Sequence, residues 1–224
     1  MKEAVALILS GNPELFGIVW VSLVVSLSST FFAALAGVPA GFFLAFARFT
    51  GKRTLESALT ALLALPTVVV GLFVYAFLSR RGVFGSLDLL YSKSAMVIGQ
   101  TILVFPVVTV FTLAAARAVD DRFRQTALTL GAGRFAAALA VAREARLGVL
   151  AAVLAAFGRV IAEVGVSMML GGNIKGFTRT MTTAMALEYD KGEFVLALGL
   201  GVVLLAIAFF TTFTLQFLQH KKRA

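Results

Sequence analysis

The chain alternates between long apolar stretches and short polar segments. Five stretches are long enough to cross a bilayer, for which about 20 apolar residues suffice, and they cover approximately residues 16–47, 55–78, 95–118, 147–170 and 194–218. Backbone groups in hydrocarbon must find their hydrogen bonds within the segment, and no alternating barrel pattern is present, so the stretches predict helices. The expected fold is an all-α, polytopic transmembrane helical bundle of about five spans, with residues 1–224 forming a single transmembrane domain.

The first stretch, residues 16–47, is too long for one perpendicular crossing. Pro39 lies inside it and has no amide hydrogen to donate to the carbonyl of Leu35, so a kink or a break is expected there. The short apolar run before residue 12 does not read as a cleavable signal peptide, and the first long span is expected to serve as an uncleaved signal anchor.

The composition agrees with a membrane protein. Sixty per cent of the residues are hydrophobic, 14% are charged, and the mean hydropathy is +0.97. A soluble domain needs more charge to cover its surface, so the surrounding solvent must include membrane lipid. The chain has no cysteine, which excludes disulfides and thiolate metal sites, and no metal site is predicted.

The net charge of +9 comes from basic residues that lie between the apolar runs, which indicates positively charged cytoplasmic loops and argues against nucleic acid. An odd number of spans places the termini on opposite sides. The segments richer in Lys and Arg, expected in the cytoplasm, carry Arg48, Lys52, Arg53, Arg117, Arg122, Arg124, Arg134, Arg143, Arg146, Lys221, Lys222 and Arg223. The N-terminus is then outside and the C-terminus inside, with Trp20, Tyr75, Tyr91 and Tyr189 near the outer ends of spans, at headgroup level.

A longer polar loop, about residues 118–146, separates the third and fourth stretches. Asp120 suits a helix N-terminus, because its carboxylate accepts hydrogen bonds from free amides. A helical run to Leu130 follows, Gly131 permits a tight turn, and residues 135–143 read as a second short helix. The pattern predicts a helix–glycine–helix projection, a shape that is able to dock on a partner protein. On the residues alone, a loop lying on the membrane surface is the competing interpretation.

The sequence Thr-Ala-Leu-Thr-Leu-Gly-Ala over residues 126–132 resembles the glutamate-alanine-alanine signature of ABC importer permeases, which usually ends in Leu-Gly-Ala. In that family the loop forms the coupling helix that sits in a groove of the ATP-hydrolysing subunit, so the resemblance implies the same role here. Gln125 stands where the signature has its glutamate, and Thr126 replaces the first alanine, which changes particular salt bridges rather than docking. The implied docking residues are Gln125, Thr126, Ala127, Leu130, Gly131, Ala132 and Arg134.

The fourth stretch places Arg159 and Glu163 four residues apart in an apolar helix. That spacing puts both side chains on one face, one turn apart. An unpaired charge is costly in hydrocarbon, so the two are expected to face the bundle interior and pair with each other. The alternative is that Arg159 contacts an anionic cargo.

An external stretch, residues 171–192, follows the fourth span. Its hydroxyl-rich run, residues 178–183, is able to bind oxygen atoms, and residues 180–189 are expected to form a short helix on the outer surface. The candidate residues of the external loop are Asn173, Lys175 and Arg179. Lys175 and Arg179 either attract an anion or acidic residues of a delivery protein, or are solvated loop charges. Candidates for the lining of a pathway, with bundle packing as the alternative for each, are Thr67, Thr101, Ser167, Met168 and Met169.

Residues 158–188 resemble the tungstate and molybdate branch of the importer permeases, the tungstate type most closely, through Arg-Val-Ile-Ala-Glu-Val-Gly and the Gly-Gly-Asn-Ile turn before Thr-Arg-Thr. The general resemblance runs over residues 21–217 and implies a type I ABC importer permease fold. It also implies two copies of this chain around a central pathway, two ATP-binding subunits that use ATP and Mg²⁺, and an external substrate-binding protein.

The chain has no G-x-x-x-x-G-K-[ST] pattern and is not expected to bind ATP or any cofactor itself. No nucleophile, base and orienting group can be assembled, so no catalytic residue is predicted. A secondary transporter or channel for a small anion is the alternative, but a proton relay needs several buried acids or histidines. The chain offers Glu163 and His220, and no inverted repeat is visible. The sequence predicts a permease subunit of the cytoplasmic membrane that imports an oxyanion, tungstate or molybdate.

Overall fold

The computed structural model describes residues 2–223; the side chains of residues 5, 121, 134, 215 and 217–223 lie outside that description. Every regular element in this part of the chain is helical. The elements are α1 (Lys2–Leu9), α2 (Pro13–Phe46), α3 (Lys52–Ala61), η1 (Leu62–Ala64), α4 (Thr67–Leu78), η2 (Gly85–Leu87), α5 (Lys93–Arg117), α6 (Asp121–Thr129), α7 (Arg134–Glu144), α8 (Arg146–Ile161), α9 (Gly165–Gly171), α10 (Met181–Lys191) and α11 (Phe194–Arg223).

The expected all-α bundle of about five spans is confirmed, but two of the spans are broken. Helices α2, α5 and α11 are each long and apolar enough to cross a membrane in one piece. The second span bends by 102° between η1 and α4, and the fourth bends by 61° between α8 and α9. The sequence pattern predicted five stretches by length and did not reveal that two of them change direction within the membrane.

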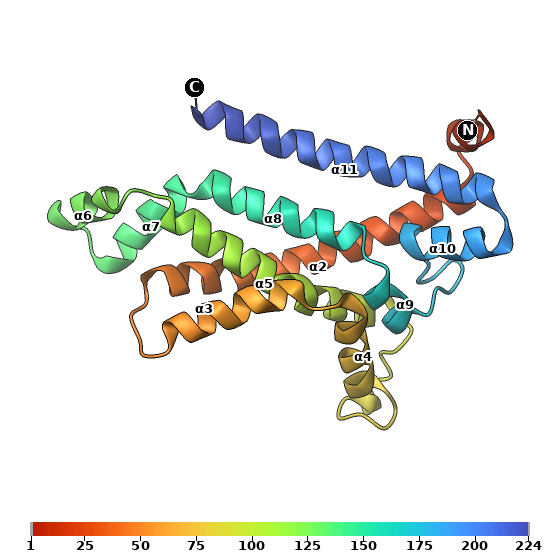
Figure 1. Cartoon of the computed structure of the whole chain (residues 1–224), viewed down its shortest axis with the longest axis horizontal. Coiled ribbons are helices and arrows are strands. Elements are labelled where there is room, and N and C mark those ends of the chain that lie inside the picture. Colours follow the sequence, from red (N-terminus) through yellow and green to blue (C-terminus); the bar gives the residue numbers. More distant parts are fainter. Residues whose placement is uncertain (1, 224) are drawn as a thin grey trace.

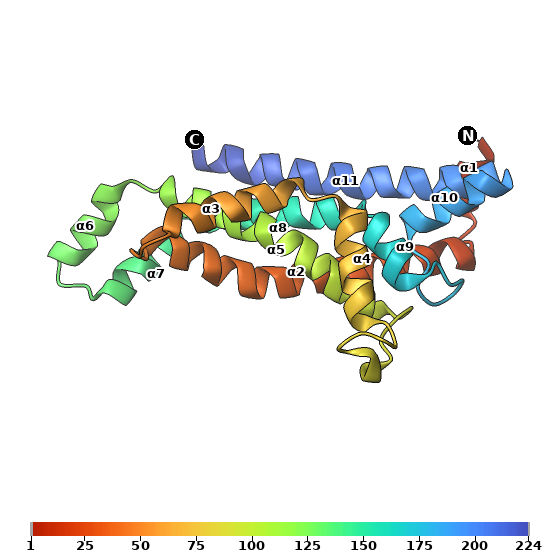
Figure 2. The same cartoon turned by 60° about the horizontal axis from the view of Figure 1, so that its bottom comes forward.

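The long helices α2, α5, α8 and α11 run side by side along the length of the molecule, while α4 stands across them (Figures 1 and 2). The α6–α7 pair projects from one end, near the end of α11 that carries the C-terminus, and α1 and α10 lie at the other end. Helices α2, α5 and α11, which follow this long direction, have the length to cross a bilayer core of about 30 Å.

Prolines in two spans have different local effects. Helix α2 runs as one element from Pro13 to Phe46 with Pro39 inside it, so the expected break is absent. At Leu65, the residue before Pro66, the backbone is extended with φ −61° and ψ 132°, and α4 begins immediately afterwards. A residue before proline is disfavoured in the helical region. Leu65 follows this preference, so the helix is interrupted there. In α2 the helix is held by its packing along α5.

Helix α2 approaches α5 closely through glycine. A Cβ atom at Gly41 would lie 2.7 Å from the carbonyl oxygen of Thr109 and 2.7 Å from Cβ of Thr112, and one at Gly37 would lie 3.0 Å from Val108. Small residues are what allow two helix backbones to approach within a membrane, where no hydrophobic effect drives helices together. The α2–α5 contact is the central packing of the bundle, and buried residues of α4, α8 and α9 join it in one core cluster.

A methyl group at this contact should loosen the bundle. We expect Gly41→Ala to lower the free energy of unfolding by about 1–3 kcal/mol, because backbone atoms must move to accept the methyl group. Gly17→Ala in the same helix is the matched control, since a Cβ there meets no heavy atom within 4 Å. Thermal unfolding of the purified protein in detergent measures both, and equal melting temperatures would show that the contact is not tight.

Candidate functional site

The α6–α7 pair has the helix–glycine–helix geometry expected from the sequence. The Asp120 carboxylate accepts a hydrogen bond from the amide of Arg122 at 2.8 Å and so caps α6. The chain then reverses at Gly131, whose φ of +86° lies in the left-handed region that glycine adopts without steric cost. The amide of Gly131 donates to the carbonyl of Leu128 and that of Ala132 to the carbonyl of Ala127. These bonds make the turn a rigid helix C-cap.

The same pair presents apolar side chains away from the bundle. Leu130 and Phe135, one on each side of the glycine turn, are each 83% exposed. Gln125, Thr126 and Gly131 are exposed as well, Ala127 and Ala132 are half-buried, and the side chain of Arg134 lies outside the described residues. Exposed large apolar groups on a polar projection mark a surface that another protein covers. Their role in docking an ATPase remains a prediction.

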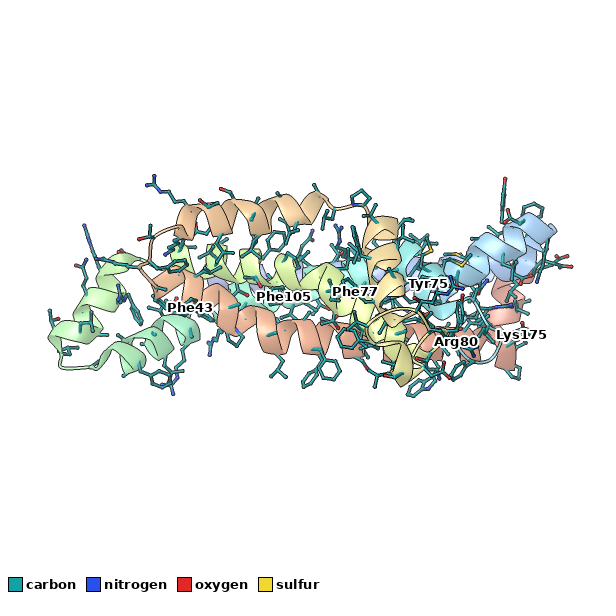
Figure 3. All side chains as sticks on the ribbon, turned by 90° about the horizontal axis from the view of Figure 1, so that it is seen from below. Phe43, Tyr75, Phe77, Arg80, Phe105 and Lys175 are labelled. Atoms are coloured by element: carbon teal, nitrogen blue, oxygen red, sulfur yellow. The ribbon has the colours of Figure 1, made fainter. Side chains whose placement is uncertain are left out.

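Two sets of contacts tie this end of the bundle together. The Arg124 guanidinium lies 5.5 Å from the ring centroid of Phe46, which joins α6 to the end of α2. Arg117, at the end of α5, pairs with Glu56 of α3. Lys52 of α3 donates to the carbonyl of Ala47 at 2.9 Å, just past the last residue of α2. The α6–α7 pair is therefore joined to α2 by a side-chain contact and to α3 through α5. Figure 3 shows Phe43 of α2 at this end of the molecule.

The two broken spans meet each other, and we call the segments 64–68 and 162–165 the junction. A Cβ atom on Gly165 would lie 2.8 Å from the hydroxyl oxygen of Thr67. One on Gly71 would lie 3.1 Å from Cβ of Met169 and 3.2 Å from Cα of Val166. Two pathway candidates, Thr67 and Met169, thus lie at the contact between the two spans, each half-buried. Exposed apolar side chains surround the contact, namely Leu65, Val68, Val164 and Met168.

The remaining pathway candidates belong to a buried hydrogen-bond network. The side-chain amide of Gln100 donates to the hydroxyl of Ser167 at 2.9 Å, and its carbonyl accepts from the hydroxyl of Ser29 at 3.0 Å. Thr101 donates to the backbone carbonyl of Ser29 at 3.3 Å. Gln100 is only 1% exposed. Ser167 and Thr101 therefore join α2, α5 and α9 within one copy; Ser167 is buried, whereas Thr101 is half-buried. Gln100 was not among the predicted residues, although an amide in an apolar helix signals an interhelical hydrogen bond.

The expected ion pair between Arg159 and Glu163 is wrong. Helix α8 ends at Ile161, so the spacing of four residues no longer places both side chains on one helical face. The Glu163 carboxylate accepts a hydrogen bond from the amide of Val166 at 3.1 Å, at the start of α9. Arg159 forms no ion pair with any carboxylate among the described side chains. Its Nε atom is buried without a hydrogen-bond partner.

The hydroxyl-rich part of the external segment, residues 178–183, is buried rather than open. The Thr182 hydroxyl donates to the carbonyl of Glu163 at 2.7 Å, and the amide of Met181 donates to Ser22 of α2 at 2.7 Å. Thr180 and Thr183 form a reciprocal capping box at the start of α10. The expected helix is therefore present, but its first turn is wedged into the bundle instead of lying on the outer surface. Its hydroxyl groups are occupied by protein atoms, so the expected oxygen-binding surface is absent.

The three external-loop candidates also have partners within the chain. Asn173 donates to the carbonyl of Thr183 at 3.3 Å. Lys175 pairs with Glu14 at 2.7 Å, and Arg179, which is 8% exposed, lies 3.5 Å from the Glu188 carboxylate. Arg179 is thus not a solvated loop charge. Figure 3 shows Lys175 toward the end of the molecule opposite the α6–α7 pair.

A tyrosine pair closes the outer side of α9. The amide of Tyr91 donates to the carbonyl of Leu170 at 2.8 Å, and the Tyr91 ring lies against Gly172. The ring centroids of Tyr75 and Tyr91 are 6.5 Å apart in an edge-on arrangement. The hydrogen bond between the phenols and the charge of Tyr75, with a smaller contribution from burial, raise the pKa of Tyr91 above its ordinary value.

A helical bundle with two broken spans in contact, and a rigid projection with exposed apolar residues at one end, defines a polytopic membrane protein. The family of binding-protein-dependent transport system inner membrane components matches residues 37–224. The chain belongs to this family and is a multi-pass protein of the inner membrane.

Three relatives indicate where the chain lies within the family. The tungstate uptake system permease protein TupB of Peptoclostridium acidaminophilum is 36% identical over 220 residues, covering 98% of this chain and 96% of the relative. A probable anion ABC transporter permease of Haloferax volcanii is 40% identical over 198 residues, covering 86% and 85%. The molybdenum transport system permease protein ModB of Escherichia coli strain K12 is 32% identical over 178 residues, covering 74% and 78%.

The fold has a counterpart among solved structures. A chain of the MetNI methionine ABC transporter in an inward-facing conformation superposes with a TM-score of 0.74, covering 92% of this chain and 95% of that chain. The sequence identity is 17%, so the similarity concerns the fold alone. It agrees with the type I importer permease fold expected from the sequence.

The buried network generates a test. We expect Gln100→Leu and Ser167→Ala to be coupled in a double-mutant cycle by about 0.6–2 kcal/mol, the range of interhelical hydrogen bonds in membranes. The measurement is reversible unfolding in mixed micelles. The exposed Thr60, whose hydroxyl bonds only within its own helix, gives the control pair Gln100→Leu and Thr60→Ala. Additive effects of the first pair would contradict the bond.

Proposed function

We propose that this chain is the transmembrane permease subunit of an ATP-driven importer that moves tungstate, or molybdate, across the cytoplasmic membrane. The observation that carries the proposal is the rigid α6–Gly131–α7 projection, found in a chain that is 36% identical to a tungstate uptake permease along 98% of its length. The relatives named for tungstate, molybdenum and anions all concern oxyanion or anion transport.

The proposal assigns a partner to each end of the bundle. Two ATP-binding subunits, which hold ATP and Mg²⁺, dock on the exposed turn between Leu130 and Phe135 of two copies of this chain. An external substrate-binding protein delivers the anion at the end that carries α10. The N-terminus is then outside and the C-terminus in the cytoplasm, with lipid around the bundle. The chain itself binds no ATP and no cofactor in this scheme.

The contacts inside the chain suggest how ATP binding drives transport. When the ATPases close, they displace the α6–α7 pair, which is joined to α2 through Arg124 and Phe46. Helix α5 leads into α6 and pairs through Arg117 with Glu56 of α3. Helix α3 continues through η1 to the break before α4, where the junction lies. The motion thus reaches the junction through helices, which transmit displacement because they are rigid.

Gly131 offers a test of coupling. We expect Gly131→Val to reduce ATPase stimulation by loaded binding protein, and tungstate uptake, at least tenfold in proteoliposomes containing the complete transporter. A β-branched residue cannot adopt the φ of +86° without strain, so the exposed turn is distorted.

Gly51→Val is the matched control. Gly51 lies outside the docking turn, just before α3, with a similar φ of +87°, and a Cβ there meets no heavy atom within 4 Å. We expect it to retain at least half of the activity. Uptake that is independent of ATP and unchanged in both variants would contradict an ATP-driven importer and indicate a channel or secondary transporter for a small anion.

A further inference from the structure

Arg159 is a charge deep in the membrane without a counter-charge. It lies thirteen residues after Arg146, which begins α8, and at 1.5 Å per residue this is about 20 Å into the span. It pairs with no carboxylate among the described side chains, and its Nε atom is buried without a hydrogen-bond partner. Arginine at this depth costs several kcal/mol unless an anion or water compensates it, so such residues mark transport pathways.

The surroundings of Arg159 show which side of α8 is open. Ala152, Ala156 and Val160 are buried in the bundle. On another side, Leu154 and Phe157 line an apolar groove of about 970 Å³ between α2, α8 and α11. The remaining side carries Ala151, Ala155, Gly158 and Ala162, a strip of small residues that borders Arg159. A Cβ atom on Gly158 would meet no heavy atom within 4 Å, and Ala162 is exposed.

This open strip leads to the junction. Ala162 caps the end of α8, and Val164 and Met168, both exposed, follow it. Small side chains along the strip leave room beside the backbone, and the guanidinium at its edge supplies charge. No carboxylate among the described side chains pairs with Arg159: Glu163, the one nearest in sequence, is 6% exposed and bonded to the amide of Val166.

We infer that Arg159 binds the anionic cargo in mid-membrane, on the side of α8 that carries Ala155, Gly158 and Ala162. The inference rests on the proposed function as an oxyanion importer. A guanidinium presents parallel N–H donors that match two oxygens of a tetrahedral oxyanion. Two copies of the chain contribute two such groups, which balance the two negative charges of a tungstate-class dianion. Because no described carboxylate pairs with Arg159, its guanidinium is free to bind the anion.

Charge removal tests the inference. In proteoliposomes with the complete transporter, we expect Arg159→Gln to lower ATP-dependent uptake of labelled tungstate at least tenfold, while basal ATPase activity stays within about twofold. Arg159→Lys should recover part of the uptake. Arg80→Gln, in the exposed loop after α4, removes the same charge and should leave uptake unchanged. Figure 3 shows Arg80 in that loop. Uptake by Arg159→Gln equal to that of the native transporter would overturn the inference.

Thiol labelling separates cargo binding from a structural role. Because the chain contains no cysteine, Ala162→Cys introduces a single thiol on the open strip beside the native Arg159. We expect a charged, water-soluble thiol reagent to label it in the nucleotide-free complex and tungstate to slow the labelling. Leu205→Cys, in mid-span of α11, is the control and should not react.

Each outcome is decisive. If the Arg159→Gln variant does not assemble, the labelling of Ala162→Cys still tests the inference. Labelling that tungstate slows supports the site. A thiol at position 162 that is inaccessible, or that reacts equally with and without tungstate, overturns it and assigns Arg159 to the contact between copies. If the native transporter moves no tungstate or molybdate at all, the proposed function fails, independently of Arg159.

Discussion

The close approach of two broken spans organises the transmembrane part of this protein. A break within hydrocarbon frees backbone amides and carbonyls that lipid cannot satisfy, so it persists only where protein atoms replace the lost hydrogen bonds. The Glu163 carboxylate accepts the amide of Val166, and Thr182 donates to the carbonyl of Glu163. The absence of a side chain on Gly165 lets α9 lie against Thr67 and Val68 of the other broken span. Each break thus depends on its surroundings rather than on its own helix.

The two breaks are the points at which the spans change direction. Helices α2 and α5 are held together by glycine contacts and by the Ser29–Gln100 bond, and the Gln100–Ser167 bond ties α9 to them. Helix α4 begins at the other break, so a change of a few backbone angles there redirects it without unfolding a span. The α6–α7 pair lies at the far end and joins the same helices through α5. The α6–α7 pair is thereby connected to the junction through α5, α3 and η1.

The sequence predicted the spans and the helix–glycine–helix loop well, because both follow from local patterns: apolar length, an acidic cap and one glycine at a turn. It did not predict which proline breaks a span. Pro39 and Pro66 are chemically identical, yet Pro39 remains in a helix held against α5 whereas Pro66 follows an extended residue. The Arg159–Glu163 pairing failed for the same reason, since spacing along a helix has meaning only if the helix continues. Packing between distant segments decides both cases.

The most direct test of the account is the distance between the junctions of two copies. A spin label on Val164→Cys, the only cysteine in such a chain, reports that distance in the complete transporter by pulsed electron resonance. The account predicts that the separation differs between the nucleotide-free complex and the complex closed by ATP and loaded binding protein. A control label on Leu27→Cys in α2 should move less. An unchanged separation at Val164 in both states would contradict a junction that moves during transport.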